Sequence, residues 1–151
     1  SRSLWNGDDA ARPLSSSGQE QAAHLGTLLP LFGPDRLVSA PPLRCRATIA
    51  PLAEQLGLPV GDEPLLGEED YWDRPRAGLA RLRQLATAPG VTAVASQGGV
   101  IPDVVRALVE SSPQRLLVDP SAVPSRKAST WVLGFTGSVL RSADYYSHPT
   151  G

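Results

Sequence analysis

The sequence contains no methionine, one cysteine and two histidines among its 151 residues, and aromatic residues make up only 5% of it. The single cysteine, Cys45, cannot form an internal disulfide, which favours a reducing compartment. No apolar run approaches the ~18 residues that a membrane span requires, and the N-terminus has no signal-peptide pattern. We therefore expect a cytoplasmic protein. The missing methionine and the start at Ser1 also predict that an upstream segment is absent.

The chain also lacks an excess of charge of either sign. It has 14 basic and 15 acidic side chains and a net charge of -1. Binding to polymeric nucleic acid or to an anionic membrane needs a clustered positive field, so neither is expected as a partner. The length suits one domain, able to bury roughly 68–70% of its unfolded surface. We expect a single, N-terminally incomplete domain over residues 1–151.

Apolar periodicity, prolines and glycines divide the chain into alternating helices and strands. Helices are expected over residues 15–32, 43–56, 79–86 and 100–110, and strands over 36–39, 58–63 and 91–96. The acidic stretch 68–73 reads as a loop, and Thr136-Gly137 predicts a hairpin between strands 129–135 and 138–143. This order predicts a three-layer α/β/α sandwich whose sheet is mostly parallel, with a C-terminal antiparallel hairpin.

In such a sheet, ligands bind beyond the carboxyl ends of the strands, where helices begin. Residues 39–46 and 96–99 are therefore the candidate loops. Arg44 and Arg46 start a helix there and could bind one phosphate together with its free backbone amides. Equally, both could be solvated, with Arg46 paired to Glu54. Cys45 has no Cys-x5-Arg loop, which favours a packing role.

The other candidates are weaker when each is taken alone. Glu68 in the acidic stretch could act as a general acid, although a solvated loop is the simpler interpretation. Ser96 fits neither a Walker loop nor a nucleophile elbow. His24 and His148 have no metal-ligand neighbours at useful spacing, so no metal site is predicted. Arg12 and the pair Arg126-Lys127 could border an anionic site.

Taken together and in order, several motifs resemble the histidine phosphatase (phosphoglycerate mutase-like) superfamily over nearly the whole chain. They are Asp8-Asp9-x-x-Arg12-Pro13-Leu14, Ser39-Ala40-Pro41-Pro42-Leu43-Arg44, Glu68 and Ser96-Gln97-Gly98-Gly99. The likeness is closest to the C-terminal domain of two-domain MutT-like Nudix hydrolases, on Glu68-Glu69-x-Tyr71, Val100-Ile101-Pro102-Asp103 and Arg126-Lys127-x-Ser129-Thr130-Trp131.

The resemblance implies roles for particular residues. Arg44 matches the arginine that binds phosphoryl oxygens, and Glu68 matches the usual proton donor. The family nucleophile is the histidine of an Arg-His-Gly motif on a first strand, and this chain starts after the place for that strand. Gln97 replaces the second family histidine and cannot carry a proton. The implied catalytic residues are Arg44, Glu68 and Gln97, with Arg12 and Gly98 also binding phosphate.

The implied function is a phosphate-binding domain of a nucleotide phosphohydrolase that acts on oxidised guanine nucleotides or dinucleoside polyphosphates. Two alternatives stay open: a non-catalytic stabilising or dimerising module, and a free-standing phosphohistidine or phosphomonoester phosphatase. The expected partners are a phosphorylated small molecule or nucleotide, and an N-terminal Nudix domain or another copy of the chain. No cofactor is expected in this domain, whereas the Nudix domain would use magnesium.

Overall fold

A computed structural model describes residues 9–148 of the chain. The helices are α1 (Ser16–Leu28), α2 (Leu43–Leu56), α3 (Glu68–Asp73), α4 (Pro75–Thr87) and α5 (Val100–Glu110), with 3-10 turns at Asp9–Ala11, Leu29–Phe32 and Pro64–Leu66. The strands are β1 (Arg36–Ser39), β2 (Val60–Asp62), β3 (Thr92–Ala95), β4 (Thr130–Thr136) and β5 (Val139–Tyr146). The predicted helices and strands appear in the predicted order, and the structure adds helix α3 to them.

Local signals explain where the helices begin and end. The side chain of Ser15 accepts a hydrogen bond from the Gly18 backbone N–H and so caps α1. Helix α2 starts directly after the double proline and ends at Gly57, which adopts a left-handed backbone with φ of 65°. A residue without a side chain adopts that conformation at no steric cost, so glycine fits this helix end.

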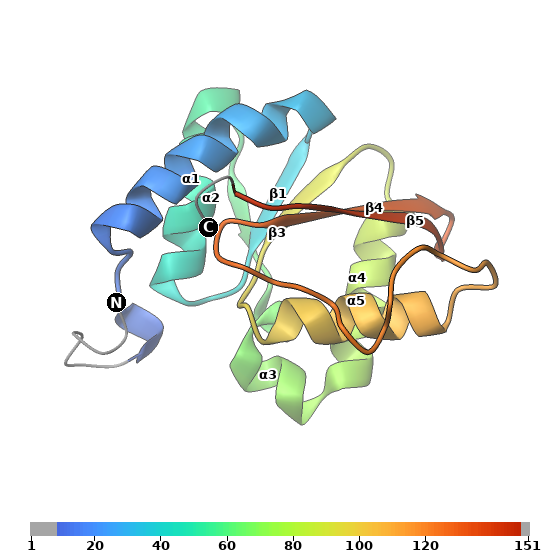
Figure 1. Ribbon diagram of the computed structural model, residues 1–151. Helices are drawn as coiled ribbons and strands as arrows, with labels where there is room; N and C mark the ends of the chain where they lie inside the picture. Colours follow the sequence, from blue (N-terminus) through green and yellow to red (C-terminus); the bar gives the residue numbers. More distant parts are fainter. Residues whose placement is uncertain (1–8, 149–151) are drawn as a thin grey trace.

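The first sheet is parallel and has the strand order β2-β1-β3. Helices cover both of its faces (Figure 1). On one face, Leu37 of β1 packs with Ile49 and Leu52 of α2. On the other face, Val38 of β1 packs with Leu85 of α4. Because successive side chains of a strand point to opposite faces, the neighbours Leu37 and Val38 each serve one layer, as a three-layer α/β arrangement requires.

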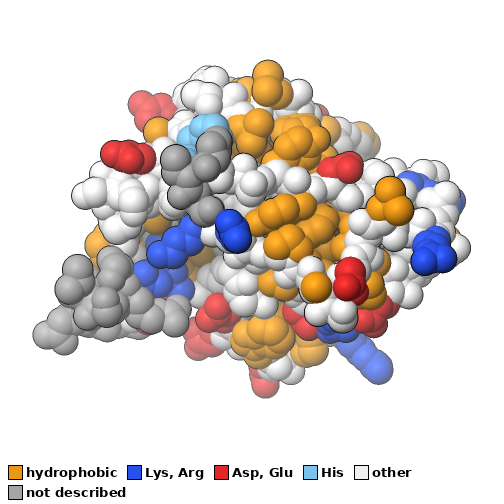
Figure 2. Space-filling model, in the orientation of Figure 1, with side chains coloured by type: hydrophobic (Ala, Val, Ile, Leu, Met, Phe, Trp, Pro, Cys, Tyr) orange, Lys and Arg blue, Asp and Glu red, His pale blue; other side chains and the backbone are white. Residues whose placement is uncertain are grey.

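Strands β4 and β5 form a separate antiparallel sheet. Its apolar side chains pack on α5, in a cluster around the buried residues Val104 and Leu108 of that helix. Figure 2 shows hydrophobic side chains gathered over the hairpin on the side facing the reader. The hairpin therefore belongs to the α5 layer of the core and does not extend the parallel sheet. The fold is mixed α/β, with a parallel sheet and a C-terminal antiparallel hairpin, as predicted.

Several elements differ from the sequence-based expectation: α4 begins at Pro75 and not at residue 79, and β2 is shorter than expected. The acidic stretch 68–73 is not a loop but helix α3, whose first turn holds Glu68, Glu69 and Asp70. Carboxylates at a helix N-terminus are stabilised by its dipole, which makes this run suitable for a short helix. The helix predicted over residues 15–32 ends at Leu28 and continues as a 3-10 turn. Strand β5 runs on to Tyr146.

Some expectations concern residues outside the described range. Asp8 of the first motif lies there. Within residues 9–148, no helix has the length and apolar character needed to cross a membrane.

Candidate functional site

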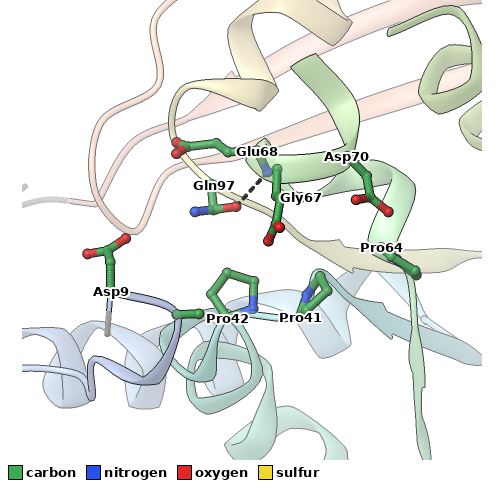
Figure 3. Close-up of a pocket in the computed structure, with 10 residues that line it drawn as sticks. Asp9, Pro41, Pro42, Pro64, Gly67, Glu68, Asp70 and Gln97 are labelled. Carbon is green, nitrogen blue, oxygen red and sulfur yellow. Dashed lines mark hydrogen bonds between the residues drawn. The ribbon is translucent and has the colours of Figure 1, made fainter. Parts of the chain in front are cut away.

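A pocket of about 400 Å³ opens beyond the carboxyl ends of β1 and β3. Asp9 and Pro42 lie on one side of it, and Gln97 with Glu68 on the other (Figure 3). The loops that the sequence singled out therefore meet at one place. The full lining consists of Asp9, Ala10, Pro41, Pro42, Pro64, Gly67, Glu68, Glu69, Asp70 and Gln97.

Gln97 supplies a fixed hydrogen-bond donor to this pocket. Its side-chain Oε1 accepts a hydrogen bond of 2.7 Å from the backbone N–H of Glu68, which orients the amide and leaves its NH₂ group on the other side. Figure 3 shows the amide nitrogen on the side away from the Glu68 backbone N–H. The residue is only 7% exposed, so its conformation is tightly restricted. An NH₂ group held in this way can donate to a phosphoryl oxygen.

Arg44 and Arg12 do not themselves line the pocket, but both contact the carboxylate of Asp9, which lines it on the side opposite Gln97. The Arg44 Nη2 lies 3.2 Å from one Asp9 oxygen, and the Arg12 Nε lies 3.1 Å from the other. Arg44 also donates through Nη1 to the Asp9 backbone carbonyl, at 2.9 Å. Both arginine side chains are 14% exposed, whereas Asp9 is 51% exposed. Asp9, which lines the pocket, is thus an anion held between two cations.

Charges from both sides of the pocket act on the buried thiol of Cys45. Burial raises the pKa of this thiol to about 11, the positive charge of Arg44 lowers it in part, and the negative charge of Glu68 raises it further. A thiol with so high a pKa is protonated at neutral pH, which agrees with the predicted packing role of Cys45.

Glycines allow the two loops on the Glu68 side to approach each other. A Cβ on Gly99 would lie 3.1 Å from a Glu68 carboxylate oxygen, so this carboxylate packs against the start of α5. A Cβ on Gly98 would meet no atom within 4 Å, and its backbone is exposed. The start of α5 therefore lies close to Glu68, and Gly98, the second proposed phosphate ligand on this loop, is open to solvent.

The remaining candidates lie elsewhere or have other partners. Arg46 forms an ion pair with Asp62 of β2, and not with Glu54. The rings of His24 and His148 contact each other, with centroids 4.6 Å apart, and neither lines the pocket. The Arg126 backbone N–H donates to the Tyr145 hydroxyl at 3.0 Å. In the range 9–148, no imidazole therefore lines the pocket, and no group of three potential ligand residues could hold a metal ion.

The sequence analysis missed Asp9 as the link between the two arginines. The spacing of Asp9 and Arg12, three residues apart in a 3-10 turn, is compatible with a local ion pair. Nothing in the spacing indicates that Arg44 also reaches this carboxylate, because that contact joins residues 35 positions apart.

Comparisons with known proteins agree with this description. A family model described as histidine phosphatase superfamily (branch 1) matches residues 4–75. An 8-oxo-(d)GTP phosphatase of Mycolicibacterium smegmatis is 41% identical over 148 residues, which cover 98% of this chain and 45% of that protein. The chain thus spans less than half the length of this relative.

Solved structures show the same fold at low identity. A SixA-type protein from Nakamurella multipartitia has a TM-score of 0.67 at 20% identity, covering 97% of this chain and 90% of its own. A mycobacterial glucosyl-3-phosphoglycerate phosphatase has a TM-score of 0.61 at 18% identity, covering 89% and 86%. The family model thus matches residues 4–75, and the described residues share the fold of these two solved structures.

Proposed function

We propose that this chain is the phosphate-binding domain of a nucleotide phosphohydrolase that acts on oxidised guanine nucleotides. The observation that carries the proposal is the 41% identity to an 8-oxo-(d)GTP phosphatase over 98% of the chain. Phosphate would bind between the guanidinium of Arg44 and the amide of Gln97. Arg12 and the backbone of Gly98 would supply further donors, and Glu68 would serve as the proton donor.

The arrangement of Arg44 and Arg12 supports an anion site. Two guanidinium groups already hold the two oxygens of one carboxylate, a geometry that resembles arginine binding to two phosphate oxygens. At an effective dielectric of 20, a charge pair at ~4 Å contributes about 4 kcal/mol, against ~0.3–1 kcal/mol for a helix N-terminus. The arginines would therefore supply most of the affinity for phosphate, with Gln97 setting its orientation.

The nucleophilic histidine would come from a strand outside this chain. β3 is an edge strand of the parallel sheet, and no strand within residues 9–148 pairs with its second edge. Such an edge has unpaired backbone groups that can accept another strand. We propose that a segment carrying Arg-His-Gly pairs there, from the rest of the parent protein or from another copy of the chain.

The finer assignment follows the likeness to two-domain proteins. An N-terminal Nudix domain would hydrolyse the nucleotide with magnesium, in the cytoplasm, and dinucleoside polyphosphates are a second substrate class for it. That domain would bind the magnesium. This chain would then process or hold a phosphorylated product.

A non-catalytic module is the second candidate, and the substitution at Gln97 favours it. An amide can donate a hydrogen bond but cannot transfer a proton. In that case the domain would stabilise or dimerise its partner domain and bind phosphate without turnover. A free-standing phosphohistidine phosphatase has weaker support, because the low identity to SixA-type proteins bears on the fold alone.

The proposal is tested with the full-length protein that contains this chain. We expect hydrolysis of 8-oxo-dGTP in the presence of magnesium, and of p-nitrophenyl phosphate if this domain is catalytic. Arg44→Ala should abolish the second activity, while Arg46→Ala, two residues along the same helix, should retain it. Phosphatase activity that survives Arg44→Ala would show that the pocket is wrong. Absence of both activities would leave only the non-catalytic module.

A further inference from the structure

Three hydrogen bonds that involve side chains connect residues 66–71, which lead into α3, to residues 96–103, which lead into α5. The Ser96 hydroxyl donates to the Leu66 carbonyl, and the Glu68 backbone N–H donates to Gln97 Oε1. The third bond joins the Tyr71 hydroxyl to Asp103 Oδ2 at 2.6 Å. The bonds follow one another along both segments. They hold the two loops on the amide side of the pocket in a fixed relative position.

Tyr71 is the most enclosed member of this group. Its side chain is fully buried, with an exposed fraction of 0%. A Cβ on Gly78 of α4 would lie 2.5 Å from the Tyr71 ring, so helix α4 closes over the ring with no room to spare. The ring is therefore closely packed, and its hydroxyl donates to the carboxylate of Asp103. Asp103 is in turn held by Arg106, at 2.6 Å.

Neither residue lines the pocket, but backbone hydrogen bonds connect the segments of both to residues that do. The Tyr71 backbone N–H bonds to the Gly67 carbonyl, next to Glu68. Asp103 lies in the first turn of α5, and that turn is joined to Gln97 by hydrogen bonds from the Val100 and Ile101 N–H groups to the Gln97 carbonyl. A shift at the Tyr71–Asp103 contact would therefore move the Glu68 N–H relative to the Gln97 amide.

We propose that Tyr71 and Asp103 are positioning residues that keep the Gln97 NH₂ group directed into the phosphate pocket. This inference rests on the proposed phosphate-binding function, since neither residue touches the pocket. The hydrogen bond between them sets the distance between α3 and α5, and that distance lets Glu68 orient the amide. Without it, the amide can rotate and present its oxygen to an anion, which repels the ligand.

The electrostatics of the pair support this role. Burial raises the pKa of the Tyr71 hydroxyl, and the bond to Asp103 raises it further, so the phenol keeps its proton at any physiological pH. For Asp103, burial alone raises the pKa, but hydrogen bonds from Tyr71 and Arg106 outweigh it and give a net lowering. The donor and the acceptor thus stay in their bonding forms.

The test uses the ligand-free chain and its complex with inorganic phosphate. The side-chain NH₂ signals of Gln97 are assigned by nuclear magnetic resonance from their loss in Gln97→Ala. Tyr71→Phe should shift or broaden these signals and weaken phosphate binding about 3- to 10-fold. Asp103→Asn keeps an oxygen acceptor for Tyr71 and should have a smaller effect in the same direction. Tyr145→Phe also removes a bonded hydroxyl, outside the pocket, and should leave both readouts unchanged.

The outcomes separate this inference from the function on which it rests. Unchanged Gln97 signals in Tyr71→Phe, with phosphate affinity within twofold of the wild type, would overturn it. If the wild-type chain binds no phosphate, the proposed function fails, but the Gln97 signals still decide whether Tyr71 positions the amide. Equal changes in Tyr145→Phe would show a general loss of structure and would also contradict a specific positioning role.

Discussion

The two sides of the pocket differ in charge: arginines lie behind one side, and a neutral amide lies on the other. On the arginine side, Arg44 and Arg12 carry full charges, but both contact the Asp9 carboxylate. On the amide side, Gln97 carries no charge, yet the Glu68 backbone N–H binds its oxygen and so fixes the orientation of its NH₂ group. The arginine side offers electrostatic attraction for an anion, which Asp9 already partly neutralises. The amide side offers a hydrogen-bond donor in a fixed orientation. We infer that affinity and orientation for phosphate come from separate parts of the chain.

Among the variants that test this contrast, removal of the Arg44 side chain should have the largest effect on phosphate binding. Arg44→Ala should weaken binding of inorganic phosphate by about 10- to 100-fold, because hydrogen bonds to a charged group contribute ≈ 1.5–3 kcal/mol. Isothermal titration calorimetry measures the effect. Arg46→Ala, on the same helix but paired with Asp62, is the control and should bind normally. Similar losses in both variants would mean that general charge, and not the position of Arg44, attracts the anion.

On the amide side, Gln97→Glu keeps an oxygen acceptor for the Glu68 N–H but replaces the NH₂ donor with a second oxygen. We expect about tenfold weaker phosphate binding, on the order of 1.4 kcal/mol, from loss of the donor and from repulsion. Gln114→Glu makes the same charge change at an exposed loop position and is the matched control. Unchanged affinity in Gln97→Glu would place the anion away from this amide.

Asp9→Asn tests the same contrast with the opposite expected sign, because it should strengthen phosphate binding. The variant removes the negative charge that the two arginines share, so phosphate should bind about three- to fivefold more tightly, less than 1 kcal/mol because Asp9 is half exposed. The affinity should also depend more steeply on salt concentration. Weaker binding in Asp9→Asn would show instead that Asp9 orients the arginines for the ligand and does not compete with it.

The smallest expected effect concerns pH. The folded state lowers the pKa of Asp103, so its ionised form adds stability above the unfolded value of ≈ 3.9, and this is lost as pH falls through the folded value. The wild type should therefore be more stable than Asp103→Asn at pH 7, with the gap closing below about pH 4. Thermal unfolding at several pH values checks this. A gap that is constant from pH 7 to pH 3 would contradict it.

The fold and part of the site could be predicted from the sequence, and particular residues show why. Helix α2 and strand β1 could be predicted because the double proline, Gly57 and the run Leu37-Val38 are local signals. Helix α3 was missed, since its stability depends on carboxylates at a helix end and on the burial of Tyr71. Carboxylate-rich segments without apolar periodicity are usually solvated loops, and sequence alone does not show that Tyr71 is buried.

In the site, too, features that depend on neighbouring residues could be predicted, and contacts between residues far apart in the sequence could not. Arg44, Glu68 and Gln97 could be proposed from their places after strands and from the family resemblance. Their partners could not, because each contact joins distant positions: Arg44 to Asp9, and Tyr71 to Asp103. Such contacts depend on how helices pack, and the side-chain geometry that decides them is set by the whole core.

The most direct test of a shared anion site is a crystal of the chain soaked with tungstate, an oxyanion whose position is unambiguous in electron density. We expect one tungstate between Arg44 and Gln97, with oxygens within hydrogen-bond distance of the guanidinium and of Nε2, and with the Asp9 carboxylate displaced. A tungstate bound elsewhere, or one that contacts Arg44 while the Gln97 amide nitrogen points away, would contradict it.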